Sequence, residues 1–420
     1  MKKISTLIGI ILLLFYSIGF NVLAKESDTS GTYEIEVEYL IYSILDLEKI
    51  GNDREWSLDK NYKLMVDIDL NDISSEGDNW VPIGTRKEPF TGRFDGNGYT
   101  LKNVRIIESE LGIVGFFGWM SESSVIENVY LENVSIQLPN SECGSLVGVI
   151  LGGTVRNCGS SGSVSGMSAG GLIGIGSGVV ENCYSSTSVY STSTYAGGLI
   201  SQFGIFQEYK SVLKKCYSSG DVVGRMYVAG LVGNVYEADI EDCYSTSNVM
   251  SFDKTISIGG LVGSMFYGYL RNSYFAGELY SAGLKFGSGY QSVGGIVGDS
   301  MGTIENCIVL SSKIQVGFDI QSAVHIWRIT AWAANLSNNY VVESLRIITE
   351  RIISAITHSP SERHGGIKTI EEVMVQDTYE KLGWNFGPEN PVWEFSGEYR
   401  LPKLVGVGGQ ENLVTPSHLL

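Results

Sequence analysis

One pattern recurs through the middle of this 420-residue chain and limits what the chain can fold into. Its first half is a glycine-apolar cluster of the type Gly-Gly-Leu-Val-Gly, found at residues 144–148, 170–174, 197–201, 229–233, 259–263 and 294–298. Its second half is a short motif of the type Ile-Glu-Asn-Cys-Tyr, found at residues 155–158, 180–184, 213–217, 240–244, 270–274 and 304–307. Consecutive clusters are 26 to 35 residues apart. A repeat of this length indicates stacked units, each too small to bury an apolar face alone.

Each unit is typical of short strands separated by turns. A Val or Leu stands six residues after most of the cysteine positions, as Val189 does after Cys183. An even separation places both side chains on one face of a strand, so we expect both to point inward. Asn usually precedes the Cys, which predicts a bend at that residue. No copy contains a helical stretch, which argues against a leucine-rich or βαβ solenoid, and the units are too short for propeller blades.

The repeat therefore predicts an all-β fold, a right-handed single-stranded parallel β-helix of about ten coils spaced about 4.8 Å apart. We expect an N-terminal cap over residues 25–61, coils over 62–343, a small mixed helical and loop cap over 344–405 and a flexible tail over 406–420. Residues 33–50 alternate like a strand and then become helix-like. Residues 344–356 have helical spacing, and Thr369 with Glu372 fits a capping box.

Composition agrees with repeated tight corners and sets limits on function. The chain has 52 Gly but only 8 Pro, as expected if glycines form the corners and ladder N–H groups must be kept. Its 29 basic and 46 acidic residues give a net charge of −17, which disfavours nucleic acid as a partner. Residues 1–24 have the pattern of a signal peptide, so we expect an exported monomer with no membrane span after cleavage.

The repeat resembles the GLUG motif of secreted and surface bacterial proteins. The leader Phe-Thr-Gly-Arg-Phe-Asp-Gly-Asn-Gly-Tyr at residues 90–99 and the closing segment around Trp384 and Trp393 are similar to those that flank such repeats. The resemblance covers about residues 35–405. It implies a β-helix of the kind found in adhesin-like proteins and in the non-catalytic region of immunoglobulin-A-cleaving metallopeptidases, and it implies no enzymatic activity.

Five cysteines occupy the same position of the repeat and are expected to form an inward ladder: Cys158, Cys183, Cys216, Cys243 and Cys307. Two interpretations stay open, namely small buried thiols that fill a tight layer, or disulfides between adjacent coils. Ser273 in the same position favours the first, because any small side chain suffices there.

If the cysteines point inward, the residue after each points outward. The tyrosines in that position predict an exposed stripe along one face: Tyr184, Tyr217, Tyr244 and Tyr274. The stripe is either a platform for sugar rings or a protein ligand, or a ladder of stacked rings that only stabilises the coils. The longest insertions, residues 202–211 and 282–292, are the expected contact loops.

Nothing in the sequence indicates catalysis. The four histidines (His325, His358, His364 and His418) form no His-Glu-x-x-His pair, so we expect no metal site and no cofactor. Asp67 with Asp69, and Asp95 with Asn97, suit turns, while Glu181, Glu241 and Glu305 recur at one position as a solvated face would.

We therefore expect a secreted or surface-associated, non-catalytic scaffold for adhesion or for binding a glycan or a host or matrix protein. Two alternatives stay open. The first is an accessory module of a surface peptidase system, and the second is a polysaccharide-degrading β-helix enzyme.

Overall fold

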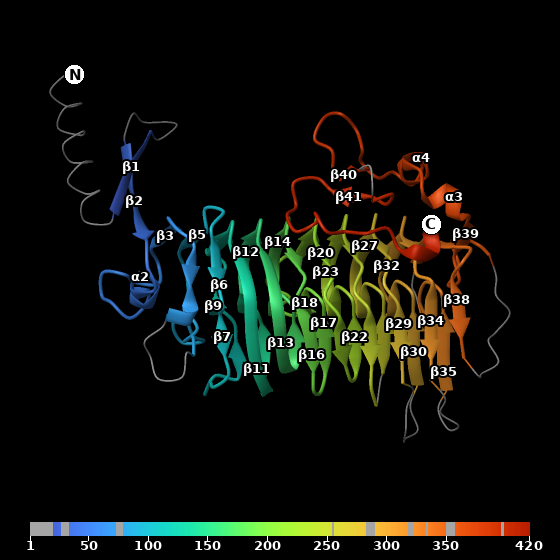
Figure 1. Cartoon of the computed structure of the whole chain (residues 1–420), viewed down its shortest axis with the longest axis horizontal. Coiled ribbons are helices and arrows are strands. Elements are labelled where there is room, and N and C mark those ends of the chain that lie inside the picture. Colours follow the sequence, from blue (N-terminus) through green and yellow to red (C-terminus); the bar gives the residue numbers. More distant parts are fainter. Residues whose placement is uncertain are drawn as a thin grey trace.

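The computed structural model describes residues 20–26, 33–72, 79–253, 256–282, 290–317, 323–332, 335–349, 358–395 and 399–420. Over these residues the chain winds into a parallel β-helix of about nine turns, which confirms the predicted architecture. Figure 1 shows the coils stacked side by side along the long axis, in sequence order from the blue N-terminal end to the orange last coil. The C-terminal segment then doubles back along the flank of the stack.

One long face of the β-helix is a 15-stranded sheet that carries the residues just before each cysteine. Only its first two strands are antiparallel. The apolar residues three before the cysteine positions lie in register, with Val155 beside Val180 and Val180 beside Leu213. The strands are β1 (Phe20–Glu26), β2 (Tyr33–Ile41), β3 (Asn61–Leu64), β5 (Arg93–Asp95), β9 (Phe117–Met120), β10 (Val125–Glu127), β12 (Val147–Arg156), β14 (Ile173–Glu181), β18 (Ile200–Phe203), β19 (Val212–Lys214), β23 (Val232–Glu241), β27 (Val262–Arg271), β31 (Val297–Ser300), β32 (Thr303–Glu305) and β36 (Asn335–Ser337).

The remaining faces begin at the cysteine positions and consist of shorter strands that pair in parallel from coil to coil. Tyr184 lies beside Tyr217 and Val189 beside Val222, so the repeat and the coil have the same period. In the early coils these strands are β4 (Ile68–Asp69), β6 (Thr100–Lys102), β7 (Arg105–Ile106), β8 (Ile113–Val114), β11 (Tyr130–Gly144) and β13 (Gly159–Gly170). In the middle coils they are β15 (Tyr184–Ser185), β16 (Ser188–Ser191), β17 (Tyr195–Gly197), β20 (Tyr217–Ser218), β21 (Val222–Gly224), β22 (Tyr227–Ala229), β24 (Tyr244–Ser245), β25 (Val249–Ser251) and β26 (Ser257–Gly259). In the last coils they are β28 (Tyr274–Phe275), β29 (Leu279–Ser281), β30 (Tyr290–Gly294), β33 (Ile308–Val309), β34 (Lys313–Val316), β35 (Ala323–Trp327), β37 (Tyr340–Val342), β38 (Arg346–Ile348) and β39 (Gly366–Lys368).

The bend before each cysteine is formed by a residue in the left-handed backbone region. Asn157 and Asn182 both have φ of 53° there, a conformation that Asn tolerates better than most residues. Their side-chain amides also bond along the stack, because Asn182 Nδ2 donates to Asn157 Oδ1 at 3.1 Å. The bend thus uses Asn for its backbone and for an amide ladder between coils. Lys215 and Asp242 interrupt this ladder, with φ of 52° and 54°.

The interior is a continuous apolar core to which every coil contributes. The cysteines and the residues six positions later are buried in it, as predicted, including Cys183 and Val189. The glycine corners bring backbones too close for a side chain. A Cβ at Gly198 would stand 2.0 Å from the carbonyl oxygen of Gly230 in the next coil.

The N-terminal cap agrees with the expected strand and helix. Strand β2 is followed by helix α2 (Ile44–Lys49), whose Ser43 side chain accepts from the backbone of Asp46. Because β2 pairs with β3, the long sheet already begins within the predicted cap. The predicted signal peptide lies mostly outside the described residues. The last residues of the predicted signal peptide belong to β1. Further along the chain, a 3-10 turn, η1 (Leu70–Asp72), follows β4.

The C-terminal cap differs from the expectation in two respects. Residues 346–348 form strand β38 rather than the predicted helix, because their coil pairs with β34, and residues 350–357 lie outside the described part of the chain. The predicted capping box at Thr369 is present on helix α3 (Ile370–Val373), followed by α4 (Gln376–Glu380). Strands β40 (Trp393–Glu394) and β41 (Lys403–Leu404) pair, and η2 (Ser417–Leu419) follows. Residues expected in a flexible tail are instead packed, with Val407 and Leu419 buried.

Candidate functional site

The predicted tyrosine stripe exists, but it is not an exposed platform. The rings of Tyr217, Tyr244 and Tyr274 stack in parallel, with centroids 4.8 Å apart at each step, and Tyr184 continues the stack at 5.4 Å. However, Tyr217, Tyr244 and Tyr274 are fully buried and only Tyr184 is half-buried. The expectation of an exposed stripe is therefore wrong for three of its four residues.

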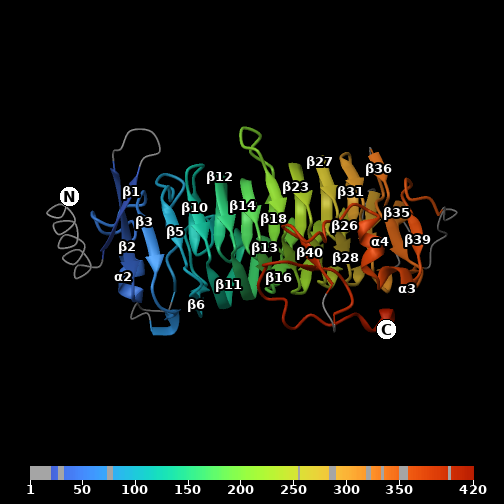
Figure 2. The same ribbon diagram turned by 90° about the horizontal axis from the view of Figure 1, so that it is seen from above.

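The C-terminal segment, residues 370–395 and 399–420, covers the tyrosines. Figure 2 shows this red segment lying along the side of the middle and last coils. Tyr217 Oη donates to the carbonyl of Gly408 at 2.9 Å, Tyr244 Oη to Gln410 Oε1 at 2.8 Å and Tyr274 Oη to the carbonyl of Pro402 at 2.9 Å. Trp384 and Trp393 pack against the same rings and belong with them to a second buried core. The stripe therefore anchors a cover, because outward aromatic rings gain from burial as well as from stacking.

The five cysteines of the ladder are unpaired and buried, so the small-thiol interpretation agrees with the structure. Cys216 Sγ lies 3.1 Å from the carbonyl of Lys214 and accepts from the backbone N–H of Cys183 at 3.4 Å. Ser273 makes the same two contacts through its hydroxyl, accepting from the Cys243 N–H at 3.0 Å. Burial raises the pKa of Cys307 to about 12, so its thiol is not poised as a nucleophile.

The recurring acidic position is part of an alternating charge ladder on the long sheet. Arg156, Glu181, Lys214, Glu241, Arg271 and Glu305 are successive partners in register. Arg271 Nε lies 3.2 Å from Glu241 Oε1, and Lys214 Nζ lies 3.4 Å from Glu241 Oε2. Glu241 thus pairs with both neighbouring coils, and the three recurring carboxylates stand on alternate coils instead of converging on one point.

The leader carboxylates likewise serve structure. Asp95 accepts from Asn128 at 2.9 Å and from the backbone of Asn97 at 2.8 Å. Asp69 accepts from Asn103 Nδ2 at 2.7 Å, and Asp67 accepts from the backbone of Thr100 at 2.8 Å. Within the described residues, no three His, Cys, Asp or Glu side chains gather as metal ligands would.

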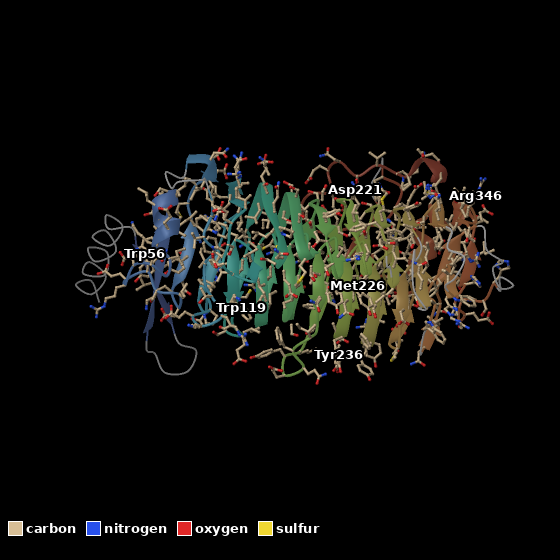
Figure 3. The ribbon with its side chains drawn as sticks, turned by 90° about the horizontal axis from the view of Figure 1, so that it is seen from below. Trp56, Trp119, Asp221, Met226, Tyr236 and Arg346 are labelled. Atoms are coloured by element: carbon tan, nitrogen blue, oxygen red, sulfur yellow. The ribbon has the colours of Figure 1, made fainter. Side chains whose placement is uncertain are left out.

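An exposed surface that sequence reasoning missed lies along one edge of the later coils. We call it the aromatic ridge, and it consists of Tyr209, Tyr236, Phe266, Tyr267, Tyr269, Met301 and Trp332. Tyr267, Tyr269 and Trp332 are each about half exposed, at 52%, 52% and 50%. Figure 3 shows Tyr236 at the margin of the β-helix, where the loop between β18 and β19 projects.

The aromatic rings of two successive coils touch within the ridge. The ring of Tyr236 on β23 lies 5.8 Å from that of Phe266 on β27, measured between centroids, and 5.9 Å from that of Tyr267. Met265 pairs with Ser300, so Met301 follows Phe266 at the same position of the next coil. Val297 pairs with Thr330, so Trp332 lies beside Asp299, two residues from Met301, and its ring stands 5.4 Å from that of His325. Exposed apolar side chains are common singly, but a contiguous row of them marks an interaction surface.

A hollow of about 420 Å³ opens beside the ridge. Tyr209 and Lys210 of the projecting loop form one side, and Glu237, Asp239 and Tyr269 form the other. Glu237 lies in register with Tyr267 and Asp239 with Tyr269, so each carboxylate stands beside a ring on the neighbouring strand. The loop at 202–211, one of the two predicted contact loops, thus borders a candidate site. In the other, residues 283–289 lie outside the described residues.

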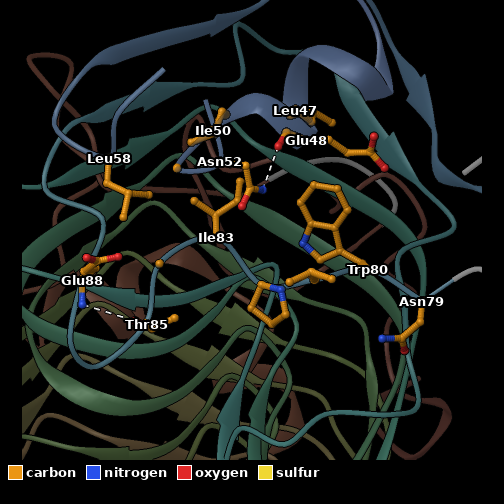
Figure 4. Close-up of a pocket in the computed structure, with 14 residues that line it drawn as sticks. Leu47, Glu48, Ile50, Asn52, Leu58, Asn79, Trp80, Ile83, Thr85 and Glu88 are labelled. Carbon is orange, nitrogen blue, oxygen red and sulfur yellow. Dashed lines mark hydrogen bonds between the residues drawn. The ribbon is translucent and has the colours of Figure 1, made fainter. Parts of the chain in front are cut away.

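A second hollow, also of about 420 Å³, lies between α2 and the loop at residues 79–88 (Figure 4). Trp80 forms one wall, with its ring stacked on Phe116 and its Nε1 donating to the Phe116 carbonyl. Its two asparagine amides donate to backbone carbonyls, Asn52 Nδ2 to that of Glu48 at 2.8 Å and Asn79 Nδ2 to that of Glu108 at 3.0 Å. This hollow separates the cap from the first coil and brings no reactive groups together.

Similarity to known proteins supports the repeat and the fold. Residues 224–250, which span one coil from β21 to β25, match the family model "The GLUG motif". Halomucin of Haloquadratum walsbyi is 35% identical over 156 residues, which is 34% of this chain and 2% of halomucin. A protein of Evansella cellulosilytica described as a Gly-rich membrane protein is 28% identical over 149 residues, 35% of this chain and 16% of that protein.

A solved structure from Bacteroides ovatus, described as an immunoglobulin A1 protease, has a similar fold. The TM-score is 0.52 at 21% sequence identity, over 88% of this chain and 92% of the other. Among the described residues, no helix has both the length and the apolar character needed to cross a membrane. The chain therefore carries the GLUG motif on the coils of a parallel β-helix, as its sequence resemblance implied.

Proposed function

We propose that this chain is an extracellular, non-catalytic β-helix scaffold that binds an external ligand, a glycan or a protein, through the aromatic ridge. The observation that carries the proposal is the row of half-exposed rings on successive coils, ending at Trp332. Such a row is unfavourable in water unless a partner covers it, whereas the tyrosine stripe of the same chain is covered by its own C-terminal segment.

The non-catalytic part of the proposal rests on how the carboxylates are used. Glycoside hydrolysis requires two carboxyl groups that flank one bond, about 5–10 Å apart. Here the carboxylates of the charge ladder stand on alternate coils, with Glu241 paired to Lys214 and Arg271, and the leader carboxylates bond to asparagine side chains. The two carboxylates that line the hollow come from one strand, β23, and so from one wall of the hollow. The extracellular part is supported by the signal-like N-terminus and by relatives described as a halomucin and as a membrane protein.

A binding screen tests the proposal. The purified chain is presented with arrayed glycans and with immobilised host-matrix proteins, and a polysaccharide-degradation assay runs alongside. We expect binding to at least one ligand, lost when Trp332 and Tyr267 are both replaced by Ala, with the melting temperature nearly unchanged. Degradation of any polymer would show an enzyme instead, and binding that survives the double substitution would remove the ridge from the function.

A second candidate is an accessory module of a surface peptidase system. The observation that favours it is the fold shared with the Bacteroides ovatus chain, 92% of which this chain covers. This candidate predicts that the ligand is a peptidase or its protein substrate. Co-purification of the exported chain with a peptidase from its own cells would favour it over adhesion.

A further inference from the structure

We infer that the ligand of the aromatic ridge is an uncharged linear polysaccharide that lies along the axis of the β-helix. The inference rests on the proposed function and names the ligand class of that same site. It is carried by three features of the ridge, which are the spacing of its rings, the free carboxylates in its hollow and the charge around it.

The rings form an extended platform rather than a single pocket. Tyr236, Phe266 and Met301 occupy one register position on three consecutive coils, so the apolar surface repeats there at the strand spacing of about 4.8 Å. Trp332 on the fourth coil lies two residues to the side of this row. A chain of pyranose rings has a repeat of similar length and presents an apolar C–H face on each ring. A polymer laid along the axis can therefore place successive sugars over successive coils, whereas a compact ligand would cover only one or two.

The hollow beside the platform supplies the polar groups that sugar hydroxyls need. Glu237 is exposed and Asp239 is half-exposed, and among the described residues neither carboxylate takes part in an ion pair. An ionised carboxylate accepts hydrogen bonds only, and hydrogen bonds to charged groups are about twice as strong as neutral ones. Two carboxylates between Tyr209 and Tyr269 thus combine stacking with acceptors for O–H groups. The hollow volume of about 420 Å³ lies in the usual range for small-ligand sites, about 300–1,000 Å³.

The charge of the surface decides between uncharged and acidic polymers. Glu237 and Asp239 line the hollow with Lys210 as the one base among its lining residues, and the whole chain carries a net charge of −17. A polyanion such as hyaluronan would approach against this field, and a carboxylate or sulfate group on the polymer would lie next to like charges. An uncharged polymer meets no such repulsion.

The test compares three probes with wild-type chain and matched variants by titration calorimetry. Cello-oligosaccharides and chito-oligosaccharides are the uncharged probes, and hyaluronan oligosaccharides are the acidic one. We expect an uncharged probe to bind and to lose about tenfold or more in affinity in the Tyr267→Ala/Tyr269→Ala variant, the loss typical of an anchoring aromatic residue. Glu237→Gln/Asp239→Asn should weaken binding about fivefold. Tyr190→Ala is the control, because Tyr190 is 44% exposed on β16, outside the ridge.

The outcomes separate this inference from the proposed function. If no oligosaccharide binds, but a matrix protein does and the Tyr267→Ala/Tyr269→Ala variant loses it, the polysaccharide inference is overturned and the scaffold function stands. Hyaluronan binding as tightly as the uncharged probes would also overturn the inference. If wild-type chain binds no glycan and no protein, both proposals fail. Circular dichroism and melting temperature establish that each variant is folded.

Discussion

Asp242 occupies a position of the repeat that Asn fills in most other coils, and replacing it with Asn should stabilise the chain at neutral pH. Its carboxylate is buried beneath the C-terminal segment, where Trp393 Nε1 donates to Oδ1 at 3.2 Å. Burial, and next the nearby charge of Glu241, raise the pKa of Asp242 from 3.8 to about 6. Lys214 Nζ, at 3.9 Å from Oδ2, only partly compensates.

The sign and size of the effect follow from this shift. Because the folded pKa lies above the unfolded one, the folded chain holds the proton more tightly between pH 3.8 and about 6, and the free energy of unfolding falls as pH rises through that window. A shift of about two units corresponds to about 3 kcal/mol of penalty at pH 8. Asp242→Asn removes the charge and keeps the shape. In the Asn ladder each amide N–H donates to the side chain of the preceding coil, where Lys215 offers no acceptor, so we expect a net gain of about 1–2 kcal/mol at pH 8 and close to none at pH 4.

Denaturant unfolding of wild-type and Asp242→Asn chains at both pH values measures this difference. Lys215→Asn is the matched control, because Lys215 also interrupts the Asn ladder, with φ of 52°, and leaves Asn182 Oδ1 buried without a partner. Lys215→Asn should raise the free energy of unfolding by about 1–2 kcal/mol at both pH values. Asn adopts the left-handed backbone conformation of this position at a lower energetic cost than Lys, and its amide can donate to Asn182 Oδ1. A gain for Asp242→Asn that is equal at pH 8 and pH 4 would refute the buried-charge argument, and a loss at pH 8 would show that the carboxylate stabilises the cover.

Three further results are expected. Cys216→Ser should change the free energy of unfolding by less than about 1 kcal/mol, because Ser273 shows that a hydroxyl at this position accepts the neighbouring N–H. Cys216→Ala should cost about 1–3 kcal/mol, because it leaves the Cys183 N–H without a partner. Equal losses for the two variants would contradict the role of this hydrogen bond. Trp393→Ala should lower the free energy of unfolding by about 3–5 kcal/mol. It should also weaken the pH dependence assigned to Asp242, because water then reaches the carboxylate. The same unfolding series measures both effects. Burial raises the pKa of Cys143 and Cys307 to about 12. The buried thiols should therefore react with a disulfide reagent at pH 8 only as fast as the chain unfolds. A rapid phase of reaction in the native chain would contradict their burial.

The repeat made the core predictable because its constraints are local. Two residues separated by six positions in a strand must share a face, so Cys183 and Val189 could be placed inside without any knowledge of the rest of the chain. The same holds for Asn182, whose backbone conformation follows from the bend that the changed parity requires. The number of coils also followed from the repeat to within about one turn.

The fate of the outward positions could not be predicted in this way, because it depends on distant residues. Parity correctly places Tyr244 outward, yet Tyr244 is buried by Gln410 and Trp393, more than 140 residues later in the sequence. The residues 406–420 have no periodicity, and their order comes from docking on rings that the repeat presents. The repeat thus shows that a side chain points outward from the solenoid, but tertiary contacts with distant residues decide whether that side chain is exposed or buried.

The two aromatic surfaces of this chain differ in whether the chain itself covers them. In the tyrosine stripe, the hydroxyls of Tyr217, Tyr244 and Tyr274 all donate to the C-terminal segment, so these three side chains have no group left for an external ligand. The ridge consists of rings from variable stretches between the two halves of the repeat, and over the described residues its members remain half exposed beside carboxylates without ion-pair partners. A surface of the first kind responds to mutation through stability, and one of the second kind through binding. Replacing Tyr274 should therefore lower stability, and replacing Tyr269 should weaken binding with little change in stability, although the two tyrosines are only five residues apart.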